Sequence, residues 1–334
     1  RSREEDDAGG GEQAPRQPAA ALGEPEPGGE PLDLLDRRHG DGDVELGRET
    51  HFFRQQGADG GIGKLGARLP GGVGRVFGGQ VIAQALQAAQ RSTDAPKIAH
   101  SLHAYFMRAG DEQHPIIYRV VRDFEGRSFA TRRVIAMQRG QAILNMAASF
   151  QVPEEGYHHQ ATMPEVPAPE TLESEATIRA RESVHVDERF RANLTRPRPI
   201  EIRPVYPRKW FNPQPTDPVQ HSWFRICAPI GDDAAVHRAV LAYASDMALL
   251  GTSMLPHGVN WTSPGLQSAS LDHALWLHEP FRADEWLLYA CDSTWAGHAR
   301  GFNRGQIFTQ GGRLVASVAQ EGLIRMRAPR PKAD

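Results

Sequence analysis

Residues 78–107 read GGQVIAQALQAAQRSTDAPKIAHSLHAYFM, and this stretch decides the fold of the chain. From Val81 to Ala89, apolar residues recur at the spacing of one helical face, and Pro96 prevents the helix from continuing. From Ile98 the pattern changes to short β-rich runs, at 101–107, 116–122, 129–137 and 143–152. Strands that follow one another closely, without helices between them, predict an antiparallel sheet.

The second half of the chain repeats this plan. Asp232 and Asp233 offer an N-cap for a helix that we expect to run to about Leu250, with Gly251 closing it. Strand-like runs follow at 268–278, 286–294, 299–309 and 314–326. A shift of 169 residues superposes Ser101-Leu102 on Ser270-Leu271 and Gln151 on Gln320. A helix and a one-faced sheet can bury each other, so we predict an α+β tandem duplication of a helix wrapped by an antiparallel sheet.

The predicted organisation has five parts. Eight acidic residues and a single large aliphatic residue, Leu22, make the first thirty residues too polar to pack, which predicts a disordered tail. The parts are the disordered tail at 1–30, a first unit at 31–152, a linker at 153–200 with some helix near 175–193, a second unit at 201–327, and a tail at 328–334.

Composition excludes several classes of function. The 334 residues contain 38 basic and 41 acidic side chains, so the net charge of −3 lacks the basic excess of a general nucleic-acid binder. No apolar stretch approaches the roughly 18 residues that cross a bilayer, so we expect no membrane insertion. Two cysteines, Cys227 and Cys291, support neither a disulfide scaffold nor a thiolate zinc site. They favour a reducing compartment, and we expect a cytoplasmic protein.

Familiar short motifs give little support to other enzyme classes. Residues 61–66, GIGKLG, match GxGxxG as a string, but no strand precedes them and Pro70 follows where a helix should begin. No GxSxG and no HExxH occurs in the chain, which argues against a serine hydrolase and a zinc protease. We therefore predict no cofactor and no metal.

Asp246 is the candidate catalytic residue. It is the only carboxylate between Ala234 and Leu250, and its helical neighbours three and four positions away are apolar or aromatic. A carboxyl group held among apolar side chains tends to have a raised pKa, which suits a general base near neutral pH. An Asp that reaches water at a helix end is the alternative that spacing alone leaves open.

Several longer motifs give the chain a family resemblance. They are GRVFGGQV at 74–81, HSLHAYF at 100–106, YASD at 243–246, LDHALW at 271–276 and VAQEG at 318–322. In this order they resemble acyl-CoA thioesterase II, the family of medium- and long-chain acyl-CoA hydrolases with a double hotdog fold. The resemblance extends from about Leu32 to Arg327.

The resemblance implies three catalytic residues. The family uses an Asp, a Ser or Thr, and a Gln to hold the attacking water, and these fall on Asp246, Ser270 and Gln320. Asp272 and His273 lie next to Ser270, and we expect a structural role for them. The 169-residue shift carries Asp246 onto Phe77, so we expect the second unit to carry the chemistry and the first to line the acyl channel.

The sequence therefore predicts an enzyme that hydrolyses medium- to long-chain fatty acyl-CoA to a free fatty acid and CoA. Fatty acyl-CoA is the expected partner, and we expect a homo-oligomer of double hotdog subunits. Two alternatives stay open: a non-catalytic acyl-CoA-binding hotdog protein and a hotdog enoyl-CoA hydratase. A hydratase would need a His-Asp pair on the helix, and His237 lies nine residues before Asp246.

Overall fold

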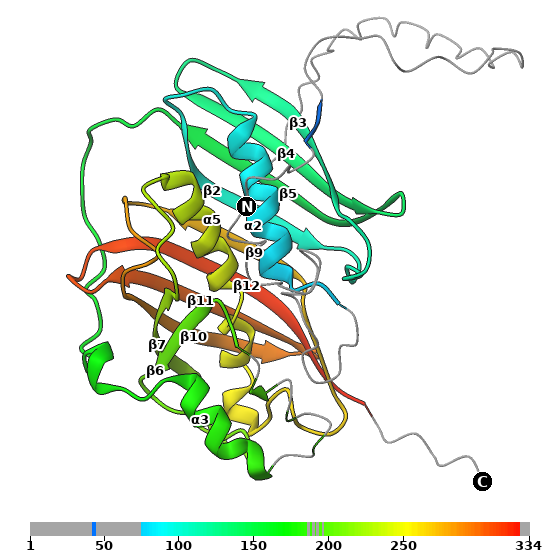
Figure 1. The fold of residues 1–334 in the computed structure, drawn as a ribbon, viewed down its shortest axis with the longest axis vertical. Helices are drawn as coiled ribbons and strands as arrows, with labels where there is room; N and C mark the ends of the chain where they lie inside the picture. The colour runs from blue at the N-terminus through cyan, green and yellow to red at the C-terminus, as the bar shows by residue number, and fades with distance from the viewer. Residues whose placement is uncertain are drawn as a thin grey trace, which may run out of the picture. The chain divides into compact units, whose positions relative to one another are not determined.

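A twelve-stranded sheet and two central helices dominate the structure, shown in Figure 1. The described strands pair in antiparallel fashion. This computed structural model describes residues 42–44, 75–185, 188, 191, 194–195 and 197–327. The predicted tails at 1–30 and 328–334 lie outside the described residues, as does the glycine-rich stretch at 61–66.

The first half of the sheet surrounds helix α2 (Gly78–Arg91). Its strands are β1 (Gly42–Val44), β2 (Ile98–Phe106), β3 (Ile117–Glu125), β4 (Phe129–Gln138) and β5 (Gln141–Gln151), in the order β1-β3-β4-β5-β2. Helix α2 is buried from Gly79 to Ala89, because the sheet covers one side of it and a second helix covers another. Ser92 ends the helix, as expected for a chain that meets Pro96 soon afterwards.

The second half has the same plan around helix α5 (Ala234–Ser245). The Asp233 side chain caps this helix, accepting a hydrogen bond from the Ala235 amide at 2.8 Å. The surrounding strands are β6 (Ile200–Pro204), β7 (Val219–Ile226), β8 (Leu266–Ser270), β9 (Asp272–Leu277), β10 (Leu287–Gly297), β11 (Arg300–Thr309) and β12 (Leu314–Met326). They follow the order β9-β12-β11-β10-β7-β6, and β8 also pairs with β12.

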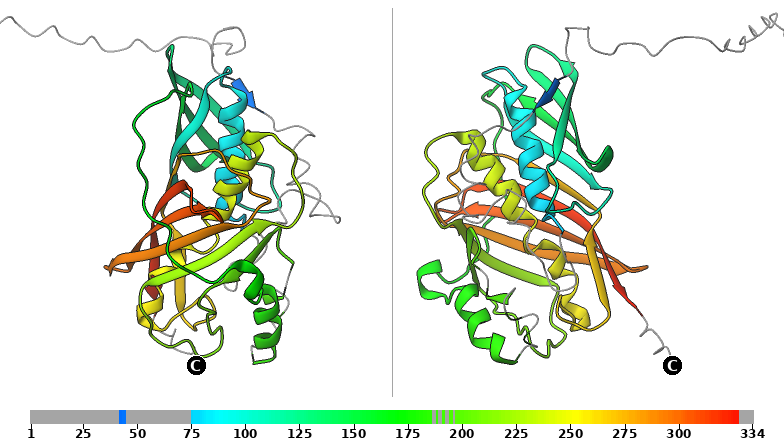
Figure 2. Two further views of the ribbon diagram at one scale, coloured as in Figure 1. Left: turned by 90° about the vertical axis from the view of Figure 1, so that its left-hand side faces the viewer. Right: turned by 45° about the vertical axis from the view of Figure 1, so that its right-hand side comes forward.

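The two halves join edge to edge through β2 and β9. These strands pair from Ser101 opposite Trp276 to Tyr105 opposite Asp272, which makes the two sheets one. Helices α2 and α5 lie side by side against this sheet (Figures 1 and 2). The predicted tandem hotdog fold is confirmed. The boundaries predicted for its units stay predictions, because one sheet runs through both.

Between the halves, the chain forms short helices. They are η2 (Pro169–Thr171), α3 (Glu175–Glu182) and η3 (Ser183–His185), and the second half adds η4 (Leu249–Thr252) and η5 (Leu255–His257). The helix expected near 175–193 is therefore present as α3, and the Ser174 hydroxyl caps it by accepting from the Thr177 amide at 3.1 Å.

Three details differ from the sequence prediction. Helix α5 ends at Ser245 instead of near Leu250, because Asp246 is its C-cap and the backbone at Ala248 leaves the helical region. The strand expected at 268–278 is two strands, broken at Leu271. Strands β6 and β7 were not predicted at all. Their sequences follow a proline-rich segment, which obscures the pattern of two-residue alternation.

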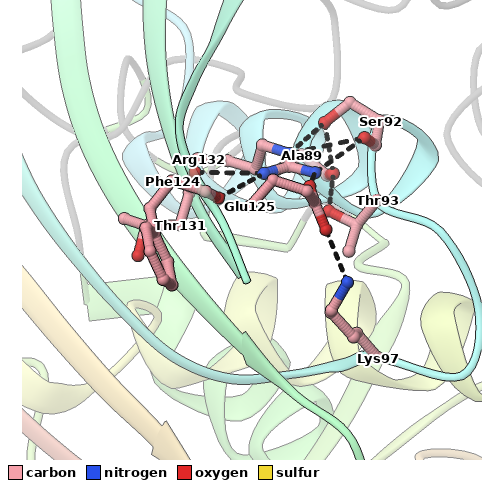
Figure 3. A network of polar contacts seen from close by, with 8 residues as sticks. All are labelled: Ala89, Ser92, Thr93, Lys97, Phe124, Glu125, Thr131 and Arg132. Carbon is pink, nitrogen blue, oxygen red and sulfur yellow. Dashed lines mark hydrogen bonds and ion pairs between the residues drawn. The ribbon is translucent and has the colours of Figure 1, made fainter. Parts of the chain in front are cut away.

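Arg132 fixes the C-terminal end of α2 to the sheet, as Figure 3 shows. Its side chain is fully buried on β4, and it donates hydrogen bonds to the Ser92 carbonyl at 3.1 and 3.3 Å and to the Phe124 carbonyl at 3.0 Å. Glu125 pairs with both Arg132 and Lys97, and hydrogen bonds from these two cations lower the pKa of the Glu125 carboxyl. A cation at a helix C-terminus also complements the helix dipole.

Candidate active site

Asp246 lies where the C-terminal end of α5 meets the N-terminal end of α2. The amide of Gly79 donates a hydrogen bond to its carboxylate. A Cβ atom on Gly78 would lie 2.9 Å from Asp246 Oδ2 and 2.8 Å from the Phe106 ring, and one on Gly79 would lie 2.5 Å from the Tyr243 carbonyl. The two helix ends can therefore approach this closely only because both positions are glycine.

The structure brings the three predicted catalytic residues together. Gln320 of β12 donates from Nε2 to Asp246 Oδ1 at 2.6 Å, and Ser270 at the end of β8 donates from Oγ to the same oxygen at 3.2 Å. Ser270 is opposite Gly322 in the β8–β12 pair, two residues from Gln320, so the sheet register places both side chains beside the end of α5. Residues far apart in sequence thus surround one carboxylate.

The environment of Asp246 changes its acidity. Only 8% of the residue is exposed, and burial raises the pKa of its carboxyl to about 6. The hydrogen bonds from Gln320, Ser270 and the Gly79 amide act in the opposite direction, because they favour the charged form. The carboxyl group is therefore mostly ionised at neutral pH and still basic enough to accept a proton.

His273 lies directly behind Gln320. It is fully buried, with Nε2 at 2.9 Å from Ser245 Oγ and Nδ1 at 3.1 Å from Gln320 Nε2. Ser245 Oγ donates to the Ala242 carbonyl at 3.0 Å, so we assign the proton of the imidazole to Nε2 and the acceptor to Nδ1. Burial lowers the pKa of His273 to about 3, which keeps the ring neutral.

These contacts leave one side of Gln320 free. Its amide nitrogen donates to both Asp246 and His273, while its oxygen, Oε1, is buried without a hydrogen-bond partner among the described residues. A buried carbonyl oxygen normally has a partner, so Oε1 is available to accept from a small polar molecule. The carboxylate of Asp246 and the free oxygen of Gln320 could together accept the two protons of one water.

Asp272 and His273, which follow Ser270 closely in the sequence, have different contacts. His273 contacts Gln320, as described above, whereas Asp272 accepts a hydrogen bond from the Glu321 amide at 2.6 Å and holds the strand register. Neither residue was predicted to touch the site. The alternation of β9 could have indicated His273, because its side chain must point to the same face as the buried Leu275 and Leu277.

The 169-residue shift matched Phe77 and Gln151 of the first half to Asp246 and Gln320, and both matches are wrong. Phe77 precedes the N-terminal end of α2, whereas Asp246 lies at the C-terminal end of α5, so the 169-residue shift does not superpose the helices. Gln151 is not the counterpart of Gln320 either. Its neighbour Phe150 is the buried residue, so Gln151 points to the other face of its strand, while Gln320 itself is buried.

The described residues contain neither a metal-ligand cluster nor a membrane-spanning helix. No three His, Cys, Asp or Glu side chains within the described part of the chain are grouped as metal ligands would be. None of the helices that the structure describes is long and apolar enough to cross a membrane.

Two family profiles match the chain in the order of its halves. The profile described as the acyl-CoA thioesterase N-terminal domain matches residues 68–151, and the profile described as acyl-CoA thioesterase matches residues 190–323. The second match contains Asp246, Ser270 and Gln320.

Known proteins show the same likeness over most of the chain. Acyl-CoA thioesterase 2 of Haemophilus influenzae is 41% identical over 254 residues, which cover 76% of this chain and 89% of that protein. Acyl-coenzyme A thioesterase 8 of Homo sapiens is 42% identical over 261 residues, covering 76% and 81%. The crystal structure of an acyl-CoA thioesterase II from Mycobacterium marinum matches with a TM-score of 0.63 and 43% identity, over 75% of this chain and 90% of that one.

Proposed function

The chain belongs to the acyl-CoA thioesterase family of thioester hydrolases, and we propose that Asp246, Ser270 and Gln320 activate the water that attacks the thioester. The proposed substrate is a medium- to long-chain fatty acyl-CoA, and the products are the free fatty acid and CoA. The observation that carries this proposal is the buried Asp246 carboxylate, held by Ser270 and Gln320 at the N-terminal end of α2.

Asp246 acts as the general base. Its ionised carboxylate takes a proton from water as the oxygen attacks the thioester carbonyl carbon, and the carbonyl becomes an oxyanion. Collapse of this intermediate breaks the carbon–sulfur bond, and the proton held by Asp246 passes to the CoA thiolate. A carboxyl with a pKa of about 6 can both accept and return the proton near neutral pH.

Gln320 and Ser270 orient the reacting water without neutralising the base. Both side chains are uncharged, so they hydrogen-bond to the carboxylate and leave its charge in place. The free Oε1 of Gln320 accepts the second proton of the water as a hydrogen bond, which fixes the direction of attack. His273 holds the Gln320 amide in this orientation by accepting from its nitrogen.

The N-terminal end of α2 supplies an electrostatic contribution. Backbone amides point out of a helix at this end, and the helix dipole is positive there. Gly78 has no side chain to block access, and the Phe106 ring lies against it. Negative charge that develops on the substrate carbonyl near this end is therefore stabilised in the transition state.

The acyl chain would follow an apolar surface at the end of β2. Phe106 lies beside Gly78 and is partly buried against the core, whereas Tyr105 points to the other face of β2. A large apolar ring beside a reactive site is typical of the lining that receives an apolar ligand. This arrangement supports a fatty acyl group as the substrate.

The hydratase alternative requires a histidine of α5 paired with Asp246, and His237 does not provide it. His237 lies near the start of α5, where Nε2 contacts the Gly231 carbonyl at 2.9 Å and Nδ1 accepts from the Ala283 amide at 3.0 Å. Both ring nitrogens therefore serve the fold, at the end of the helix opposite to Asp246.

The experiment that tests the proposal is the release of free thiol from palmitoyl-CoA or decanoyl-CoA, followed with a thiol reagent. We expect steady turnover by the wild-type chain and almost none by a folded Asp246→Asn variant. Tight binding of acyl-CoA without thiol release would instead favour the non-catalytic binding protein.

A further inference from the structure

A pocket rich in arginine lies between α3, β6 and the segment that follows Asp246. Glu175 and Arg179 of α3 form part of its lining. Met247 and Ala248, the two residues that follow Asp246, form another part. Arg198 and Arg208 also line the pocket, in the segments before and after β6. The pocket therefore includes the two residues that follow Asp246 in the chain and belongs to the linker and the second half.

Positive charge exceeds negative charge in this pocket. Among the described residues that line it, three are arginines and one, Glu175, is a carboxylate. Glu175 pairs with Arg179 at 2.7 Å and lies 3.9 Å from Arg198, while no ion pair involves Arg208 in the described part of the chain. Burial lowers the pKa of Arg208 to about 10, and burial together with the charge of Arg179 lowers that of Arg198 to about 10. Arg198 and Arg208 therefore remain cations at neutral pH.

Several polar atoms of the pocket lack a partner. Nε of Arg179, Nη2 of Arg208 and Oε1 of Gln220 are buried, and none has a hydrogen-bond partner among the described residues. Arg179 is only 5% exposed. Buried charged donors that remain unpaired are strongly unfavourable, so an anion in the pocket would supply the acceptors that the two guanidinium groups lack. Gln220 Oε1 is itself an acceptor and needs a donor instead.

Tryptophan rings hold two of the guanidinium groups in place. Arg179 lies over Trp210 at 4.6 Å from the ring centroid, and Arg208 lies over Trp261 at 5.6 Å. The two indole rings stack on each other, with their centroids 6.1 Å apart. Stacking uses the faces of the guanidinium groups and leaves their N–H edges available. The arginines are thus positioned before any ligand arrives.

We infer that this pocket binds a phosphate group of the coenzyme A part of the substrate. A guanidinium group presents two parallel N–H donors that match phosphate oxygens, and three such groups around one carboxylate favour an anion. Coenzyme A carries a 3′-phosphate and a diphosphate, and its thioester must reach Asp246, whose next two residues in the chain line the pocket. The inference rests on the proposed function for the identity of the ligand.

The first experiment measures binding to the full wild-type chain by calorimetry, without any need for turnover. Free CoA should bind at least about tenfold more tightly than pantetheine, which has no phosphate ester. Dephospho-CoA, which lacks the 3′-phosphate but keeps the diphosphate, shows which of these two groups the pocket binds. If it binds like pantetheine, the pocket holds the 3′-phosphate, and if it binds like CoA, the pocket holds the diphosphate. Equal affinities for CoA and pantetheine would overturn the inference.

The second experiment uses Arg208→Gln, because Arg208 has no ion pair to lose. This variant should bind CoA about as weakly as pantetheine, and its KM for an acyl-CoA should rise about tenfold. Its hydrolysis of the matching acyl-pantetheine should equal that of the wild type. Arg208→Lys, which keeps the charge without the planar fork, should fall between the two and serves if the Gln variant does not fold.

Arg181→Gln is the matched control. The substitution removes the same charge, from helix α3, which also carries Arg179. Arg181, however, pairs with Glu173 at 2.6 Å on the surface and does not line the pocket. An equal loss of CoA affinity in this control would show that general charge is responsible, and the inference would fail. If the wild type hydrolyses no thioester, the proposed function fails, while the binding comparison still decides whether the pocket takes a phosphate.

Discussion

Gln90 and Asp246 occupy equivalent positions on the two central helices. When the helix starts are aligned, Gly78 on Ala234, a shift of 156 residues places Gln90 on Asp246 and Gly79 on Ala235. Each of the pair contacts the second residue of the opposite helix: Asp246 accepts from the Gly79 amide, and Gln90 donates to the Ala235 carbonyl at 3.1 Å. The duplication thus has an amide in the first half where the second half has a carboxylate, and an amide cannot act as a base.

Replacement of Asp246 by Asn should abolish most of the hydrolysis. Asn has nearly the same shape but cannot take the proton of the water, and loss of a general base lowers rates by roughly 10²–10⁴-fold. The measurement is kcat with palmitoyl-CoA, with circular dichroism to show that the variant is folded. Turnover close to that of the wild type would remove Asp246 from the mechanism.

The rate should depend on pH through Asp246. The proposed base works only when it is ionised, so kcat/KM should fall as the pH is lowered through about 6, the pKa to which burial raises this carboxyl. An acid limb near the pKa of an ordinary carboxyl, about 4, would mean that the carboxyl is not buried as the structure shows. The profile should be recorded on the wild type from about pH 3.5 to about 8, so that an acid limb near either pKa lies within the range.

The same carboxyl should make the active enzyme less stable than its Asn variant at neutral pH. The folded-state pKa of Asp246 is raised above the unfolded value, so its contribution to stability is present below about pH 4 and is lost as the pH rises through about 6. Asp246→Asn, which is neutral at every pH, should therefore gain about 1–3 kcal/mol in the free energy of unfolding at pH 7. The gain should shrink toward pH 4. Denaturant unfolding at both pH values measures it, and a destabilised variant at pH 7 would contradict it.

Much of the fold could be predicted because the hydrophobic pattern is local. The helix from Gly78, both sets of four strands and the N-cap at Asp233 follow from spacing and turn-forming residues, and the structure contains them. The end of α5 could not be predicted, because apolar residues continue to Leu250 while the contacts of Asp246 come from α2, β8 and β12. Tertiary contacts decided that boundary.

The site was predictable only in part, for a related reason. Asp246 was identifiable as an isolated carboxylate on an apolar helix, but Ser270 and Gln320 came from the family resemblance, since no spacing rule links residues on separate strands. The assignments to Phe77 and Gln151 were wrong because a single shift was applied to both helices and strands. The two helices superpose with a shift of 156 residues, and the segments that connect the elements differ in length between the two halves.

Gln320 and Gln151 should respond differently to truncation. Gln320→Ala removes the group that we propose orients the water. It should lower kcat by about tenfold or more, since a lost hydrogen bond to a charged group is worth about 1.5–3 kcal/mol. Gln151→Ala is the control, because its side chain points to the other face of the sheet, and kcat should hardly change. The comparison is made at saturating acyl-CoA. Equal losses would mean that the effect of Gln320→Ala is not specific to a glutamine that contacts Asp246.

His273 should act through Gln320, and two substitutions can show this. His273→Leu removes the acceptor at Nδ1 and frees the Gln320 amide to rotate, so kcat should fall about tenfold to hundredfold, the effect of one unsatisfied buried hydrogen bond. His273→Asn restores an acceptor oxygen near Nδ1 and should recover part of the rate. The pH profile separates this role from simple loss of stability. Because the hydrogen bond from Gln320 lowers the pKa of Asp246, a rotated amide should move the acid limb of kcat/KM to higher pH in the Leu variant. A folded His273→Leu variant with an unchanged acid limb, and no recovery in His273→Asn, would show that the imidazole only fills space.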